Sequence, residues 1–198
     1  MISVVTGNNG KYNEIKEVLD KHKIKCKQEN IELDEKDNTL EDTALSKARQ
    51  AFSKIQKPLI VDDSGIFFEG KDEMDAEGVV HPFPGHKAKR AFEELGFDGL
   101  IKKAQSKDAE GVIRLCKAYF KCVICFTDGK TTKLFEGIVK GRITDKVYGS
   151  SPEGLPYDSI FVPEGYDNVF CLLPPKVAHG LKHRTIATEK FAEWFNGR

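Results

Sequence analysis

The chain has 198 residues, of which 39% are hydrophobic and 31% are charged, and its 31 basic residues balance 31 acidic ones. This length is sufficient for one sizeable hydrophobic core, so we expect a single domain over residues 1–198. A formal net charge of zero argues against an extended nucleic-acid-binding face or a polybasic membrane anchor. No apolar run approaches the roughly 20 residues of a membrane span, and Met1 leads directly into a strand pattern, so we expect a cytoplasmic protein.

The five cysteines are odd in number and lack a framework spacing, which favours a reducing compartment over a disulfide scaffold. Cys122 and Cys125 form a CxxC pattern inside AYFKCVICF, a stretch with the composition of a strand. Because an odd separation places side chains on opposite faces of a strand, we predict two core residues rather than a redox pair or a metal site.

The opening stretch MISVVTGNNGKYNEIKEVL predicts a buried strand over residues 2–5 and a helix with apolar residues at helical spacing over 12–19. The loop Thr6–Lys11 between them contains two glycines. A helix N-terminus carries unpaired N–H donors and a partial positive charge, so this loop suits a phosphate group, to which Lys11 would add a full charge. A tight turn with an asparagine N-cap explains the loop equally well, and the loop alone does not decide.

The middle of the chain predicts further alternating elements. Thr39 followed by Asp42 resembles a capping box and opens a helix with Glu41 and Asp42 in its first turn. The run LIVDDSGIFF predicts a strand that breaks at Asp62-Asp63-Ser64-Gly65, and residues 69–86 predict an exposed loop. A helix over KAKRAFEELG is expected to end at Gly96.

The second half has the pattern of an antiparallel meander. Residues 112–139 form long β-rich runs that meet at Asp128-Gly129, a good hairpin signal. A short strand is predicted over Ser159–Val162, and the stretch TIATEKFAEWF predicts a closing amphipathic helix.

Asp42, Asp62 and Asp63 are candidate ligands of a divalent metal, because Mg²⁺ binds nucleotides through one or two carboxylates together with the phosphates. Ligands bind at strand C-termini in open α/β sheets, which is where we place the aspartate pair. The alternative is that Asp62-Asp63-Ser64-Gly65 is simply a polar turn. Near the C-terminus, Lys182-His183-Arg184 is a compact cationic group that fits a phosphate or base contact, although a solvated surface turn is the commoner meaning.

The order of these motifs resembles the inosine triphosphate pyrophosphatase family, the Ham1-like non-standard purine nucleoside triphosphate pyrophosphatases. The motifs are TGNNGK, LEDTALSKA, DDSG, PG, FEGIVKGRI, YDSIFVPEGY and KHR. Each is short, but the resemblance extends over nearly the whole chain, from Ile2 to Ala187. The resemblance implies an α/β fold whose elongated mixed β-sheet and flanking helices form two lobes around a central nucleotide cleft, as a homodimer. It also implies Mg²⁺-dependent cleavage of ITP, dITP or XTP to the monophosphate and pyrophosphate.

Each motif of the resemblance implies particular site residues. The phosphate loop falls on Thr6, Gly7, Asn8, Asn9, Gly10 and Lys11, with Lys11 also stabilising the leaving pyrophosphate. The resemblance implies that Asp42 is a metal ligand and that Asp63 is a base or metal ligand, with Ser64 beside the substrate. His183 and Arg184 would contact the purine.

Departures from the family pattern concentrate in the base-reading motifs. In the family pattern GFG(Y/W)DPIF, Leu155, Pro156 and Ser159 replace an aromatic residue, a glycine and a proline, whereas Tyr157 and Asp158 match. The resemblance implies that this stretch lines the base pocket, so Leu155, Tyr157 and Asp158 are candidate base contacts. The glutamate that the family has within this stretch is missing from Phe170-Cys171-Leu172-Leu173. Ala178 stands where the family has a lysine, and Lys176, two residues earlier, could take the place of that lysine. Two alternatives therefore stay open: the same reaction on another base, and a nucleotide-binding protein that has lost catalysis.

Overall fold

The computed structural model describes residues 1–34, 39–151 and 155–198. The chain forms two compact units. The first comprises Met1–Ser64, Lys121–Ile138 and His179–Arg198, and the second comprises Gly65–Phe120 and Val139–Ala178. None of the helices within the described ranges is long and apolar enough to span a bilayer.

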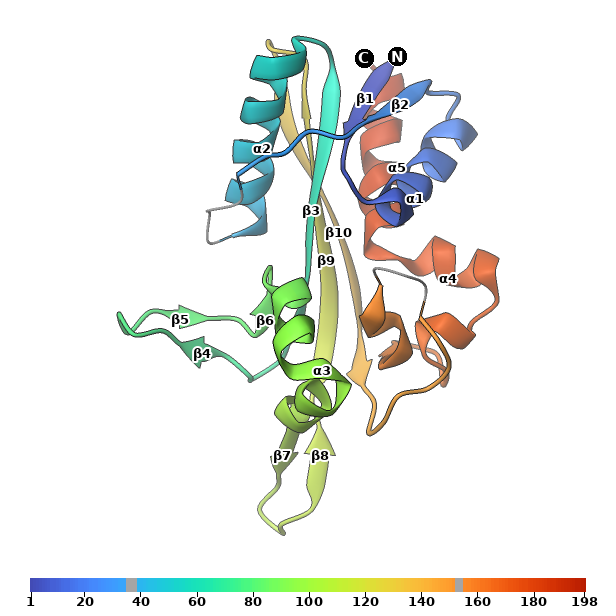
Figure 1. Cartoon of the computed structure of the whole chain (residues 1–198). Coiled ribbons are helices and arrows are strands. Elements are labelled where there is room, and N and C mark those ends of the chain that lie inside the picture. Colours follow the sequence, from blue (N-terminus) through green and yellow to red (C-terminus); the bar gives the residue numbers. More distant parts are fainter. Residues whose placement is uncertain (35–38, 152–154) are drawn as a thin grey trace. The chain divides into compact units, whose positions relative to one another are not determined.

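A mixed sheet carries the fold (Figure 1), with strand order β11-β10-β9-β3-β1-β2 and β6 added to β3. In the first unit, β1 (Ile2–Val5) pairs in parallel with β2 (Cys26–Glu29) on one side and with β3 (Leu59–Phe68) on the other. β10 (Thr132–Ile143) pairs with β11 (Phe161–Pro163) in antiparallel orientation. The expected mixed sheet with flanking helices is therefore confirmed.

Helices cover both faces of the sheet in the first unit. α1 (Asn9–Lys21) and α5 (His183–Asn196) lie side by side on one face, and α2 (Leu40–Ile55) lies on the opposite face (Figure 1). The core between α1, α5 and the strands includes Ile2, Val4, Ile15, Leu19, Ile60, Ile124, Phe126 and Phe191. The predicted helical spacing after the first loop thus corresponds to a real buried stripe.

Both predicted helix starts have side-chain caps. The side chain of Asn8 accepts the backbone N–H of Lys11 at 3.0 Å, which is the N-cap contact of α1. Thr39 accepts the N–H of Asp42 at 3.1 Å and also donates its hydroxyl to that carboxylate. Such contacts satisfy helix N–H groups that have no partner within the helix.

The predicted break in the DDSG stretch is wrong, because β3 runs without interruption from Leu59 to Phe68. The aspartates consequently lie inside a strand and not at its C-terminus. Two features let the strand continue: buried cations pair with the two carboxylates, as described below, and Gly65 passes close to β6 (Pro84–Gly85). A Cβ on Gly65 would lie 2.3 Å from the carbonyl oxygen of Gly85, so only glycine fits there.

The predicted exposed loop over 69–86 contains a small hairpin of β4 (Glu73–Met74) and β5 (Val80–His81). The Asp75 carboxylate accepts the backbone N–H groups of Glu77 and Val79, and this turn chemistry was not recognised in the sequence pattern.

α3 (Ala88–Ala104) extends beyond the predicted end at Gly96, where a positive φ of 60° interrupts the helix before a second helical piece follows. β7 (Gln105–Lys107) and β8 (Ile113–Leu115) form another antiparallel hairpin. α4 (Pro175–Leu181) directly precedes α5 in the chain.

The predicted meander is present as β9 (Lys117–Thr127) and β10, which are neighbours in the sheet and are joined at Asp128-Gly129. Cys122 and Cys125 are both fully buried in β9, as predicted, and burial raises the pKa of each thiol to about 12. The predicted strand Ser159–Val162 begins later, at Phe161, because Pro156–Ser159 forms a short 3₁₀ turn (η1). A second 3₁₀ turn (η2) spans Phe170–Leu172.

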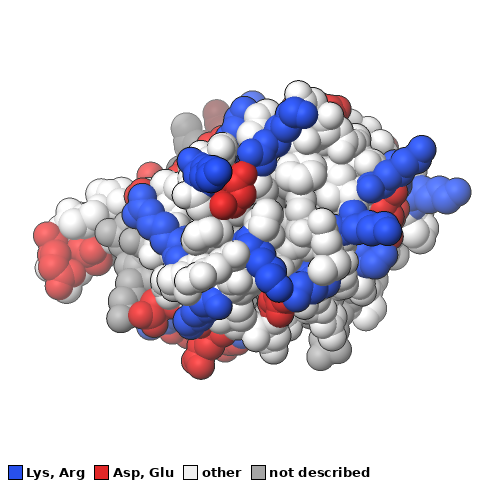
Figure 2. All heavy atoms as spheres, turned by 90° about the horizontal axis from the view of Figure 1, so that it is seen from above, with Lys and Arg blue, Asp and Glu red and all other residues white. Residues whose placement is uncertain are grey.

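Figure 2 shows one face of the molecule from above, with Lys and Arg side chains separated by uncharged surface and by acidic groups. Among the described residues drawn there, basic side chains do not gather into the continuous stripe that tracks a nucleic-acid backbone.

Candidate functional site

The predicted phosphate loop and the aspartate pair come together in the first unit. Lys11, in the first turn of α1, places its Nζ 3.1 Å from Oδ2 of Asp62 on β3. The Asp62 side chain is 2% exposed and that of Lys11 is 24% exposed, so the lysine remains accessible from solvent. The backbone N–H of Asn8 is held by the Thr6 hydroxyl at 3.2 Å, which fixes the loop before the helix.

Neighbouring aspartates of β3 contact different cations. Asp62 Oδ2 also accepts Nε of Arg184 at 3.1 Å. Burial alone would raise the pKa of Asp62, but the charges of Lys11 and Arg184 hold it well below its usual range. Asp63 Oδ1 instead lies 3.3 Å from Nζ of Lys47 on α2. The Asp62 carboxylate is therefore committed to buried ion pairs with Lys11 and Arg184, and the nearby charge of Lys47 also lowers its pKa.

Arg184 is the most deeply buried member of the cationic triplet, with its side chain 2% exposed. Its Nη1 donates to Oε2 of Glu14 at 2.5 Å, and its Nη2 donates to the Ser64 hydroxyl at 3.0 Å. With the bond to Asp62, one guanidinium thus links α5, α1 and β3. The surface-turn interpretation of Lys182-His183-Arg184 is excluded, since all three residues are buried.

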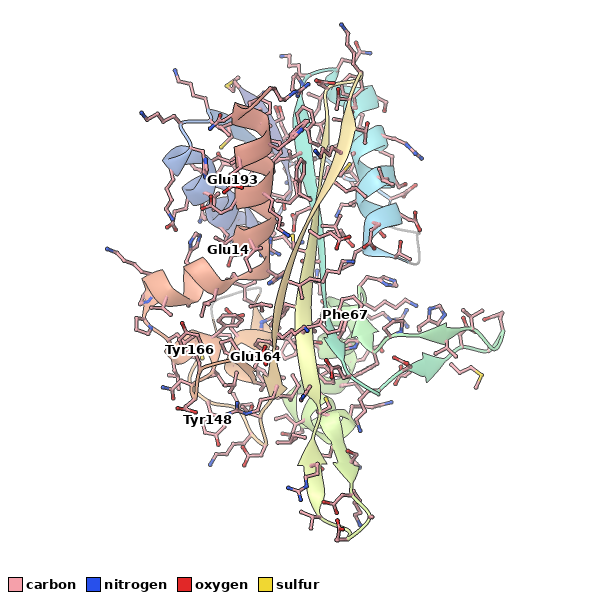
Figure 3. All side chains as sticks on the ribbon, turned by 180° about the vertical axis from the view of Figure 1, so that it is seen from behind. Glu14, Phe67, Tyr148, Glu164, Tyr166 and Glu193 are labelled. Atoms are coloured by element: carbon pink, nitrogen blue, oxygen red, sulfur yellow. The ribbon has the colours of Figure 1, made fainter. Side chains whose placement is uncertain are left out.

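Glu14 receives a second cation from the same triplet. Lys182 Nζ donates to Glu14 Oε1 at 2.8 Å. Burial would raise the pKa of Glu14, but Arg184 and Lys182 lower it overall. Figure 3 marks Glu14 on α1, near the point where α5 begins.

His183 is buried at the start of α5. Its pKa is lowered well below the usual value, first by burial and then by the neighbouring charges of Arg184 and Lys182, so the imidazole is neutral. Gly137 on β10 explains how this helix start can approach the sheet. A Cβ there would lie 1.9 Å from the carbonyl oxygen of His183.

Asp42 is exposed in the first turn of α2, where one carboxylate oxygen accepts the Thr39 hydroxyl at 2.8 Å. Glu41 beside it is paired with Lys121. Within the described ranges, no group of three or more His, Cys, Asp and Glu side chains is arranged to hold a metal ion. Asp42 and Asp63 nevertheless supply the hard oxygen donors that Mg²⁺ prefers, and Mg²⁺ at nucleotide sites uses only one or two carboxylates alongside phosphate oxygens.

Four of the candidate base contacts, Leu155, Tyr157, Asp158 and Lys176, belong to the second unit. Tyr157 is 5% exposed and donates its hydroxyl to the Ala88 carbonyl at 2.8 Å, and burial raises its pKa. Asp158 is also buried, Leu155 is half-buried, and Lys176 is exposed in the first turn of α4. In this structure Tyr157 is a packing residue, with its ring near those of Phe92 and Phe120.

Sequence reasoning missed Lys47 and Glu14 as members of the site. Both were visible as charged residues on otherwise apolar helix faces: Lys47 next to the buried Ala44 and Ala48, and Glu14 next to the buried Ile15. A buried charge is costly unless it is paired, so a charge on such a face signals a partner elsewhere in the fold.

Comparison with known proteins gives three consistent findings. The model of the Ham1 family matches residues 2–194. The dITP/XTP pyrophosphatases of Methanopyrus kandleri and Saccharolobus solfataricus are each 33% identical to this chain, over 96% and 98% of it and over 93% and 92% of their own lengths. The solved structure of the Staphylococcus aureus Ham1 protein shares the fold, with a TM-score of 0.76 at 23% identity, covering 100% of this chain and 99% of that one.

Proposed function

The chain belongs to the Ham1 family, and from this we propose that it hydrolyses non-standard purine nucleoside triphosphates, namely dITP, XTP and ITP. Water would cleave the bond between the α and β phosphates, which yields the nucleoside monophosphate and pyrophosphate. The observation that carries this proposal is the position of Lys11: it follows the capped loop at the start of α1 and contacts the aspartate strand. Groups that can bind phosphate and carboxylates that can bind a metal ion would therefore lie in one site.

We assign the triphosphate to the loop Thr6–Lys11. The first N–H groups of a helix and its dipole favour an anion, and Gly7 and Gly10 allow the backbone to approach the phosphates closely. Lys11 would add a full charge to the leaving pyrophosphate while Asp62 keeps its ammonium group in place. The loop would therefore bind the substrate and also stabilise the product that leaves.

Asp42 and Asp63 are the residues that would hold Mg²⁺. When bound, the ion neutralises phosphate charge and orients the triphosphate. Asp63 is also the carboxylate that we assign to orient the attacking water toward the α-phosphorus, with Lys47 fixing one of its oxygens. Asp62 is less suited to either task than Asp63, because its Oδ2 is shared by two cations, Lys11 and Arg184, and its side chain is only 2% exposed, against 12% for Asp63.

In the first unit, we assign base contacts to His183 and Arg184. Within the second unit, Leu155, Tyr157, Asp158 and Lys176 are proposed to keep the base-contacting role that the resemblance implies. A neutral His183 would read a base by hydrogen bonding, without adding charge. The burial of Tyr157 favours one alternative, the same reaction on a different nucleobase, because this ring packs within its own unit. We further propose that the enzyme acts in the cytoplasm as a homodimer.

The test is to incubate the purified protein with Mg²⁺ and ITP, dITP, XTP, GTP, ATP or dUTP, and to measure pyrophosphate and orthophosphate separately. The proposal expects pyrophosphate, mainly from ITP, dITP and XTP, and no product when EDTA replaces Mg²⁺. Pyrophosphate mainly from another nucleotide would retain the reaction and replace the substrate. Nucleotide binding without turnover of any of them would support a binding protein instead.

A further inference from the structure

A buried carboxylate of α1 has no role in the reaction proposed above. Glu14 is 9% exposed and lies one helical turn after Lys11, the lysine assigned to the phosphates. Its two oxygens accept from different cations, Oε1 from Lys182 and Oε2 from Arg184. Burial of a carboxylate is tolerated only when such partners compensate it, so this pairing is a built feature of the fold.

The contacts of Arg184 show what Glu14 controls. The guanidinium is planar and rigid, so fixing one of its N–H groups also fixes the direction of the others. Its Nη1 is held by Glu14, while Nε and Nη2 donate to Asp62 and Ser64, the residues on either side of Asp63 in β3. The orientation of Arg184 therefore determines the positions of the Asp62 and Ser64 side chains. These two residues flank Asp63, the carboxylate that we propose orients the attacking water.

The same chain of ion pairs reaches the phosphate loop. Asp62 Oδ2 accepts from both Arg184 and Lys11, each at 3.1 Å. Of the two carboxylates Glu14 and Asp62, only Asp62 would compensate the charge of Arg184 if the contact with Glu14 were lost. Arg184 and Lys11 would then compete for Asp62. A change at residue 14 would thus be transmitted to the lysine that contacts the phosphates.

We propose that Glu14 is a positioning residue for the pyrophosphohydrolase site: it anchors Arg184, and through Arg184 it aligns Asp62, Ser64 and Lys11. This inference rests on the proposed function. Glu14 makes no contact with the substrate in this proposal, and its effect is on the geometry of the reacting groups. Misplacement of such groups by about 1 Å costs on the order of 100-fold in rate.

Three variants test the proposal against dITP. Glu14→Gln keeps the size of the side chain and removes its charge, and we expect kcat to fall about 10- to 100-fold with a smaller change in KM, because the loop that binds the phosphates remains folded. Glu14→Asp restores a carboxylate and should recover part of kcat. Glu17→Gln is the matched control, since it makes the same change on an exposed residue of the same helix, and it should leave kcat unchanged.

A double variant separates positioning from a general structural effect. If Glu14 acts through Arg184, then Glu14→Gln combined with Arg184→Lys should lose no more kcat than Arg184→Lys alone. Multiplicative losses would overturn the proposal, and so would a kcat of Glu14→Gln equal to that of the wild type.

A readout independent of activity is the NMR signal of the Arg184 Nε–H group, which is buried against Asp62. We expect this signal to shift and to exchange faster with solvent in Glu14→Gln, but not in Glu17→Gln. An unchanged signal would overturn the anchoring role. If the wild-type protein releases no pyrophosphate from any nucleotide, the proposed function itself fails, which is a result distinct from an active wild type with an equally active Glu14→Gln.

Discussion

The ammonium group of Lys47 lies 3.3 Å from Oδ1 of Asp63, and the two side chains are only 10% and 12% exposed. The same Nζ donates to the backbone carbonyl of Asp62 at 3.0 Å. Lys47 thereby connects α2 to two consecutive residues of β3. A buried lysine held in this way fixes the position of the carboxylate and places a positive charge beside it.

Lys47→Met should lower kcat for dITP hydrolysis by about 100- to 1,000-fold, because a fixed charge at a reaction centre contributes that much on removal. The methionine preserves most of the apolar stem, so the loss reports on the ammonium group. Pyrophosphate release at saturating substrate is the measurement. Lys54→Met is the control on the same helix, where the lysine is exposed, and it should retain wild-type kcat. A fully active Lys47→Met would remove Lys47 from the site.

Asp63→Asn should nearly abolish turnover, with kcat lower by about 100- to 10,000-fold, the range expected when a general base is lost. The amide has the same size as the carboxylate but lacks the charge needed to orient water and hold Mg²⁺. Pyrophosphate release measures the effect. Near wild-type activity in this variant would show that Asp63 has neither role.

Asp62→Asn provides the contrast, because Asp62 pairs with two cations in the interior. Removing one partner of a buried ion pair typically costs about 3–5 kcal/mol in the free energy of unfolding. We expect a larger loss of stability in Asp62→Asn than in Asp63→Asn, measured by urea unfolding of both. The reverse order would contradict the division between a structural and a reactive aspartate.

Local signals were sufficient to predict the helix starts, because the caps at Asn8 and Thr39 depend on residues within three positions of each other. The burial of Arg184 was not predictable in this way, since its partners Asp62 and Glu14 are 122 and 170 residues away in the sequence. The prediction that the strand breaks at Asp62 was wrong for the same reason. Turn-forming residues stayed in a strand because distant cations compensate their charge, which illustrates how tertiary contacts override local propensity.

Gly137→Ala should reduce both stability and activity, because its Cβ would lie 1.9 Å from the carbonyl oxygen of His183 and 2.6 Å from the N atom of Ala187. Both are backbone atoms of α5, so the helix start that carries Arg184 has to shift. Overpacking of this kind costs about 1–3 kcal/mol, measured as the free energy of unfolding in urea.

Gly180→Ala is the matched control for that substitution. Nothing lies within 4 Å of a Cβ at Gly180, which is inside α4. Since alanine is favoured over glycine within a helix, we expect a gain of about 0.5–1 kcal/mol there. Equal effects of the two substitutions would contradict the steric explanation for Gly137.

The neutral, buried His183 predicts a dependence of stability on pH. Its pKa in the folded protein is well below 6.5, whereas the unfolded chain takes up a proton near 6.5. As pH falls below 6.5 the unfolded state therefore binds more protons, and folding stability decreases by up to about 1.4 kcal/mol per pH unit until the folded pKa is reached. The contribution of His183 is fully retained above pH 6.5.

Urea unfolding of the wild type and of His183→Gln at pH 7.5, 6.5 and 5.5 measures this effect. From pH 6.5 to 5.5 the wild type should lose about 1 kcal/mol more than the variant, because glutamine cannot titrate. The other four histidines are present in both proteins, so the difference between the two curves belongs to residue 183. Parallel curves would mean that His183 takes up its proton at the same pH in the folded and unfolded states, so that burial would not lower its pKa.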